Sequence, residues 1–188
     1  TQTVAINHQI SPTSSTVAVI TPDNTLLGAN TISVLLSDAN GYLNPDDLIT
    51  LPIAYVTLAV PSYGVINGSV DITGSNTGAS VVVTSLTFVN SSATTTVSQT
   101  VSVELANGSS AVPVTTFTLL PAFTGGSVDI VAYDEYDNAL YLVTLQVADL
   151  QISVDVPYAV PGENFIVSGI ATGVDVEVAS ISITDNVA

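Results

Sequence analysis

Apolar and polar residues alternate along much of this chain, most clearly in residues 94–105. One face there carries hydroxyl or acidic side chains, at Thr94, Thr96, Ser98, Thr100, Ser102 and Glu104. The other face is aliphatic apart from Gln99, with Val97, Val101, Val103 and Leu105. A period of two is typical of a strand with one face in water and the other on a core. The pattern therefore predicts a half-buried β-strand.

Runs of Val, Ile, Thr and Ser, separated by Gly, Pro, Asn and Asp, predict further strands. Their expected ranges are 16–20, 31–37, 48–60, 65–73, 80–89, 112–120, 127–133, 140–147, 150–156, 164–170 and 174–183. The dipeptide Asn107-Gly108 is a strong hairpin signal. Residues 68–72 and 126–130 both read Gly-Ser-Val-Asp-Ile, which we interpret as repeated strand chemistry and not as a domain repeat.

This number of short strands predicts an all-β fold, an antiparallel β-sandwich of immunoglobulin-like or jelly-roll kind. The 188 residues, of which 47% are hydrophobic, are enough to fill a core. No linker-like stretch divides residues 16–188, so we expect one globular body there. Residues 1–15 are expected to stand apart from this body as an N-terminal arm and hinge.

The arm, residues 1–10, reads as a strand with no neighbouring partner in sequence. Val4, Ile6, His8 and Ile10 share one face at period two. Pro12 and the surrounding Ser and Thr residues disfavour an immediate tight hairpin. The arm must therefore bury its stripe elsewhere, and we expect a groove in a neighbouring copy to receive it. The competing interpretation is a first strand within its own sheet.

Charge excludes several partners. The chain has no Lys or Arg, 16 acidic residues and one His, giving a net charge of −16 at pH 7. Nucleic acids and anionic lipids are bound mainly through Lys and Arg, so we expect neither as a partner. The longest apolar run, 51–66, is broken by Pro52 and Pro61, so no membrane span is expected.

The same charge suggests an acidic environment. Most of it disappears near pH 3, because Asp and Glu have reference pKa values of about 3.9 and 4.3. Carboxylates surrounded by other carboxylates are expected to have raised pKa values when folded. Their contribution to stability would then be full at low pH and lost as the pH rises through the folded values. Cysteine is absent, so there is no disulfide framework.

Catalytic motifs are missing, and we expect no enzyme. The chain has no Gly-x-Ser-x-Gly elbow, no Lys for a P-loop, and one His for a zinc site. Paired acidic residues leave an acid-stable glycan hydrolase as a remote alternative. Two groups offer oxygen ligands for calcium, namely Asp38, Asn40, Asp46 and Asp47, and Asp134, Asp137 and Asn138. We interpret both as ordinary β-turns, with no metal.

Three sequons begin at Asn67, Asn90 and Asn107. Each lies at a predicted loop or turn, where a transferase can reach the side chain and a sugar would lie in solvent. We therefore predict N-linked glycans at all three sites, provided that the protein is exported. No other cofactor is expected.

A β-protein without Lys or Arg, rich in Thr, Ser and Val and carrying an N-terminal arm, resembles the subunit of the archaeal thread. This family forms glycosylated surface filaments of thermoacidophilic archaea and is similar in organisation to bacterial chaperone–usher pilins. The resemblance rests on composition and the arm, not on a specific motif. It implies that Val4, Ile6, His8 and Ile10 form a donor strand that completes the next subunit.

The resemblance therefore implies an extracellular structural subunit that polymerises head to tail by donor-strand complementation. A role in adhesion or biofilm follows from the family alone. The chain lacks the disulfide of bacterial pilins and the long apolar helix with which type IV pilins and archaellins begin. The alternative function is a monomeric β-sandwich domain of a surface-layer or adhesin protein that binds carbohydrate or cells.

Overall fold

The computed structural model describes residues 31–35, 40, 48–91, 95–123 and 126–184. These residues form an all-β structure, interrupted by one short 3-10 helix, η3 (Pro121–Phe123). The chain divides into two compact units, Thr1–Leu51 and Pro52–Ala188. Strand β1 (Thr31–Val34) pairs with β2 (Ile49–Pro52) in a two-stranded sheet. The predicted boundary between residues 15 and 16 lies outside the described residues.

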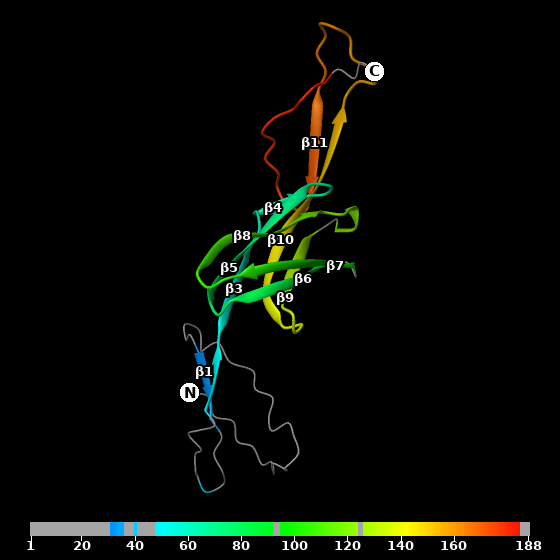
Figure 1. The fold of residues 1–188 in the computed structure, drawn as a ribbon. Coiled ribbons are helices and arrows are strands. Elements are labelled where there is room, and N and C mark those ends of the chain that lie inside the picture. The colour runs from blue at the N-terminus through cyan, green and yellow to red at the C-terminus, as the bar shows by residue number, and fades with distance from the viewer. Residues whose placement is uncertain (1–30, 36–39, 41–47, 92–94, 124–125, 185–188) are drawn as a thin grey trace. The chain divides into compact units, whose positions relative to one another are not determined.

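Residues 52–188 contain two larger sheets (Figure 1). The first has the order β11-β10-β9-β6-β7, with β4 also paired to β10, and the second has the order β3-β5-β8. The strands of the first sheet are β4 (Tyr63–Val65), β6 (Val81–Asn90), β7 (Thr96–Leu105), β9 (Ser127–Tyr133), β10 (Ala139–Val154) and β11 (Val167–Thr172). Those of the second are β3 (Ala54–Ala59), β5 (Ser69–Gly78) and β8 (Ser109–Thr118).

Strand pairing is antiparallel throughout these two sheets except at β4. This short strand runs parallel to β10, with Tyr63, Gly64 and Val65 opposite residues 146–148. The expectation of a purely antiparallel fold is therefore wrong at this point, and the six-stranded sheet is mixed. Strand β4 was not predictable from local pattern, because its three residues follow Pro61-Ser62 and pair with a strand about 80 residues away.

Both sheets contribute side chains to one hydrophobic cluster. Phe88 on β6 stacks on Phe117 of β8 with ring centroids 3.8 Å apart, and Phe123 of η3 meets Phe117 edge-on at 6.0 Å. Gln99, the polar interruption in β7, donates through Nε2 to Thr115 Oγ1 on β8 at 2.7 Å. The two sheets thus contact each other through both aromatic and polar side chains.

The repeated Gly-Ser-Val-Asp-Ile pieces adopt the same local structure. Each begins a strand, β5 or β9, and its Val and Ile are buried in the core. Each Asp accepts a hydrogen bond at 2.6 Å from a Thr on the neighbouring strand, Asp71 from Thr116 and Asp129 from Thr144. The same five residues therefore form the same half-buried strand start, with buried Val and Ile and an Asp–Thr hydrogen bond, once in each sheet.

Several strand predictions are confirmed. Strand β9 spans the predicted residues 127–133, and β7 shows the predicted alternation, with Thr96, Ser98, Thr100, Ser102 and Glu104 exposed. Other predictions are wrong. Residues 140–154, predicted as parts of two strands, belong to the single strand β10, and residues 174–183 form no strand. The predicted strand 48–60 is divided into β2 and β3, and the predicted strand 65–73 into β4 and β5. No helix among the described residues is both long and apolar enough to cross a bilayer.

Candidate assembly surface and glycan sites

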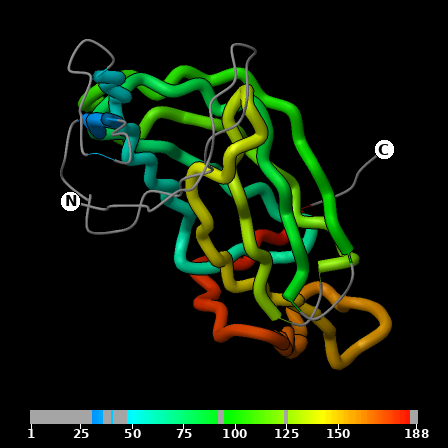
Figure 2. Tube along the Cα trace, turned by 90° about the horizontal axis from the view of Figure 1, so that it is seen from below, coloured from blue at the N-terminus to red at the C-terminus, as the bar shows by residue number. Residues whose placement is uncertain are grey.

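The last part of β10 leaves the main sheet together with β11. Residues 149–154 of β10 pair antiparallel with residues 167–172 of β11, and we call this pair the ribbon. Strand β9 pairs with β10 at residues 139–146 and does not accompany it further. Figure 1 shows the ribbon running away from the remaining strands, and in Figure 2 the orange loop at its end projects beyond the ends of the green strands.

The two faces of the ribbon differ in character. Residues directly opposite each other in an antiparallel pair lie on the same face, and successive residues alternate between faces. One face is therefore wholly apolar, with Leu150, Ile152, Val154, Val167, Gly169 and Ala171. The other face is polar apart from one residue, with Asp149, Gln151, Ser153, Ser168, Ile170 and Thr172.

The apolar face is covered only at one end of each strand by described residues, since Leu150 and Val167 are half-buried. Ile152 is 66% exposed and Val154 is 54% exposed, although residues of these types are normally buried. More than half of the exposed large hydrophobic side chains among the described residues lie between 152 and 183. Isolated two-stranded ribbons are marginally stable in water, and a third strand or a packing partner is needed to stabilise them. Exposed apolar surface of this kind is typical of interaction sites.

The hydrogen-bonding edges of the ribbon are also open. Within the described residues β11 stands at the end of its sheet with β10 as its neighbour. Residues 173–184 follow β11, and no backbone hydrogen bond joins them to another described residue. Their Val178, Ile181 and Ile183 side chains are exposed. Unpaired strand edges are sites at which another chain can add a strand.

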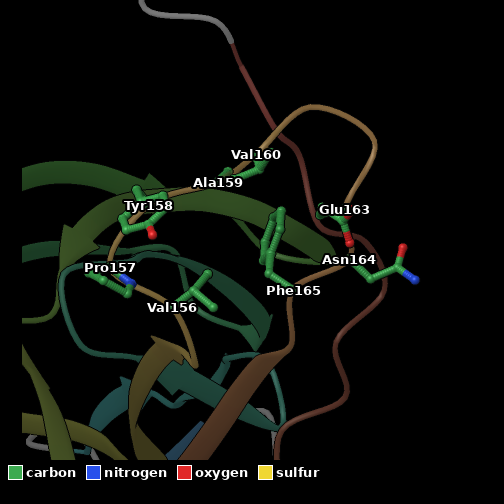
Figure 3. Close-up of a pocket in the computed structure, with 8 residues that line it drawn as sticks. All are labelled: Val156, Pro157, Tyr158, Ala159, Val160, Glu163, Asn164 and Phe165. Carbon is green, nitrogen blue, oxygen red and sulfur yellow. The ribbon is translucent and has the colours of Figure 1, made fainter.

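The loop joining β10 to β11 encloses a shallow hollow of about 260 Å³. Its lining is mainly apolar and includes Val156, Tyr158, Val160 and Phe165. Figure 3 shows Phe165 between Tyr158 and Glu163, whereas the Asn164 amide points away from the hollow. Convergent polar groups usually fix a small ligand in its pocket, and this lining does not gather them. The hollow is therefore best described as the inside of the loop that ends the ribbon.

Asp134 begins the turn between β9 and β10 and is the most buried described carboxylate, at 8% exposure. Its Oδ1 accepts hydrogen bonds from the backbone N–H groups of Tyr136 at 2.9 Å and Asn138 at 2.8 Å. Its Oδ2 accepts from Asn138 Nδ2 at 2.9 Å. Burial raises the pKa of Asp134, but the hydrogen bonds from Asn138 and Tyr136 together outweigh it and hold the pKa below its usual value.

This direction is opposite to the expected rise in carboxylate pKa, so that expectation is wrong for Asp134. The carboxylate organises the turn through its hydrogen bonds, as the β-turn interpretation of residues 134–138 predicted. Within the described residues no group of three or more acidic or histidine side chains gathers as metal ligands do. Of the other calcium candidates, Asp38, Asp46 and Asp47 lie outside the described residues.

The three sequons occupy different environments. Asn67 has a left-handed backbone, with φ of 64°, in the turn before β5, and its side chain is exposed. Asn107 is exposed in the β7–β8 hairpin, and its Oδ1 accepts a hydrogen bond from Gly78 N at 3.1 Å. Asn90 ends β6 and is 2% exposed, with Nδ2 donating to Ala122 O at 3.1 Å. The expected accessibility is thus wrong for Asn90, because a glycan on that nitrogen conflicts with its burial.

The predicted donor residues Val4, Ile6, His8 and Ile10 lie outside the described residues, so their position stays a prediction. The ribbon is the candidate feature that sequence reasoning missed. Its signal was present in the alternation of Leu150, Ile152 and Val154, but alternation indicates an apolar face and not whether that face is covered. No protein-family model matches the chain, and no curated protein matches it significantly.

Proposed function

We propose that this protein is the structural subunit of an extracellular filament, assembled head to tail by donor-strand complementation. In this proposal residues 16–188 form a β-sandwich body, and the arm at residues 1–10 completes the fold of another copy. The observation that carries the proposal is the uncovered apolar face of the ribbon. A monomer would keep that face in water, whereas a polymer buries it in every subunit except those at its end.

Three features of the sequence support the same conclusion. The arm has an apolar stripe at period two, and β-strand addition is a common way to use such a segment. Thr and Ser cover the outer face of β7, as suits a surface in solvent. The absence of Lys and Arg fits a role in which the protein binds copies of itself and not an anionic partner.

The proposed environment is acidic. At pH 7 each added subunit brings a net charge of −16 to the polymer, and repulsion between subunits opposes growth. Near pH 3 most carboxylates are neutral, so the apolar and hydrogen-bonded contacts face less opposition. We therefore expect more polymer at pH 3 than at pH 7, and at pH 7 more polymer in high salt than in low salt, because salt screens exposed charges.

Electron microscopy of the purified full-length chain at pH 3 tests the proposal, and fibres of uniform width are the expected result. Ile6→Asn places a polar amide on the apolar stripe and is expected to abolish fibres. Ala5→Asn places the same amide on the opposite face of the arm and is expected to preserve them. A wild-type chain that stays monomeric at every concentration, as measured by light scattering, would favour the monomeric adhesin or surface-layer domain instead.

A further inference from the structure

We infer that the ribbon is the acceptor for the arm, with residues 1–10 of a second copy pairing along the open edge of β11. This inference rests on the proposed function and specifies the contact that the filament would use. In this arrangement Val4, Ile6, His8 and Ile10 extend the apolar face of the ribbon. Thr3, Ala5, Asn7 and Gln9 then lie on the polar face, beside Ser168 and Thr172.

The dimensions of the two partners agree. Strands rise about 3.3 Å per residue, so the stripe from Val4 to Ile10 extends about 20 Å and the six residues of β11 extend about 17 Å. A third strand would convert the two-stranded ribbon into a sheet large enough for independent stability when one face is hydrophobic. Val178, Ile181 and Ile183, in the segment that follows β11, are further exposed apolar side chains.

The edge of β11 suits an incoming strand better than the opposite edge of the ribbon. On the β10 side, Val147 N donates to Gly126 O at 2.9 Å, so the chain that enters β9 occupies the start of that edge. Along β11, all six residues pair with β10 on one side, and no described strand lies on the other. This edge of β11 therefore has no hydrogen-bonded strand among the described residues.

At neutral pH, charge favours the arm over a second ribbon as the occupant. The ribbon and its flanking segments carry Asp149, Asp155, Glu163, Asp175 and Glu177, and no Lys or Arg exists to offset them. Two ribbons packed together would bring these carboxylates close to their counterparts, which opposes the contact at neutral pH. Residues 1–22 contain no Asp or Glu, and they include His8, the one basic side chain of the protein.

A matched pair of variants in the full-length chain tests whether the apolar face of the ribbon is the one that polymerisation uses. Ile152 and Ile170 are both 66% exposed on neighbouring strands of the ribbon, but they lie on its apolar and polar faces respectively. Ile152→Thr is expected to raise the concentration needed for polymerisation at least tenfold, whereas Ile170→Thr changes it less than twofold. Melting temperatures of the unpolymerised variants control for folding. Equal polymerisation by both variants and the wild type would overturn the inference while leaving the filament intact.

Disulfide trapping tests the edge and the second copy, since the chain has no cysteine of its own. Full-length Ile6→Cys and Ala171→Cys chains are mixed and oxidised at pH 7 and at pH 8, where thiolate forms more readily. A mixed disulfide between the two is expected in at least fivefold higher yield than between Ile6→Cys and Ser98→Cys, which places the thiol on the edge strand β7. Equal yields would overturn the acceptor assignment.

A double variant, Ile6→Cys with Ala171→Cys, distinguishes the chain's own arm from that of a second copy. Linked dimers and larger species are expected after oxidation, and closure within monomers alone would overturn the inference of a second copy. The trapping result is independent of fibre formation. If the wild type formed no fibres but the mixed disulfide appeared, the proposed filament would fail and the contact between arm and ribbon would stand.

Discussion

The two ends of β10 place similar side chains in opposite environments. In the first part of the strand, Leu145 is 1% exposed and Val147 is fully buried. A few residues later, Ile152 and Val154 are more than half exposed. Backbone conformation and hydrophobicity are alike in both parts, so neither explains the difference. The cause is the neighbourhood, because the first part lies between β9 and the core and the second leaves both.

The two parts of β10 are therefore expected to stabilise different states, the folded monomer and the assembled form. Buried side chains in the core stabilise the monomer directly, since their transfer from water is complete. The apolar side chains of the ribbon gain nothing comparable until another surface covers them. They are therefore expected to affect assembly strongly and monomer stability weakly, which is the reverse of the expectation for core residues.

The largest predicted effect compares two truncations on β10. Leu145→Ala is expected to destabilise the monomer by about 2–5 kcal/mol, because it leaves a cavity in the core. Ile152→Ala is expected to change the free energy of unfolding by less than about 0.5 kcal/mol, as exposed substitutions usually do. Urea unfolding at pH 7 and low protein concentration measures both. Similar losses in the two variants would mean that the ribbon is already covered within the monomer.

The same contrast explains which strands could be predicted from the sequence and which could not. The alternation in β7 predicted that strand and its buried face, and the Val- and Ile-rich run at 127–133 predicted β9, because both strands pack on the core. Residues 174–183 show comparable alternation, yet they form no strand, since no described partner pairs with them. Alternation is a local property, whereas pairing depends on residues that are distant in sequence. For this reason β4 and the uncovered ribbon were not predictable.

A smaller effect is expected from carboxylates at the two ends of β10. Asp134, before the strand, accepts three hydrogen bonds, and Asp155, after it, accepts one from Ile166 N at 2.8 Å. Asp134→Asn is expected to destabilise the protein by about 1 kcal/mol at pH 6, through loss of charge-assisted hydrogen bonds. Asp155→Asn, at an exposed position, should cost less than about 0.5 kcal/mol.

The pH dependence of stability tests whether folding lowers or raises the pKa of Asp134. Its folded pKa is lowered, so its contribution to stability is present above the unfolded value of about 3.9 and is lost as the pH falls through the folded pKa. The difference in unfolding free energy between the wild type and Asp134→Asn should therefore shrink between pH 5 and pH 2. A difference that grew on acidification would contradict the lowered pKa. Asp134 thus opposes any general gain of stability in acid.

The candidate sites were predictable to different degrees, and the reason is again the neighbourhood. The turn at residues 134–138 follows from local Asp and Asn chemistry, and the structure confirms it. All three sequons look alike as short motifs, but Asn90 is buried because its amide meets η3, an element 31 residues further along the chain. Local motifs therefore identify turns reliably, but they do not show which turn residues remain accessible.

The last test of covered against uncovered surface concerns the glycans. In a host that glycosylates exported proteins, we expect sugars on Asn67 and Asn107 and none on Asn90. Intact mass should show at most two glycans above the 19.2 kDa chain, reduced to one by either Asn67→Asp or Asn107→Asp. Asn90→Asp should leave the glycan mass unchanged but destabilise the protein by about 1–3 kcal/mol, since it removes a buried hydrogen-bond donor. A glycan found on Asn90 would mean that the transferase acts before β6 and η3 come together, so that the order of modification and folding, and not accessibility in the folded chain, decides where sugars are attached.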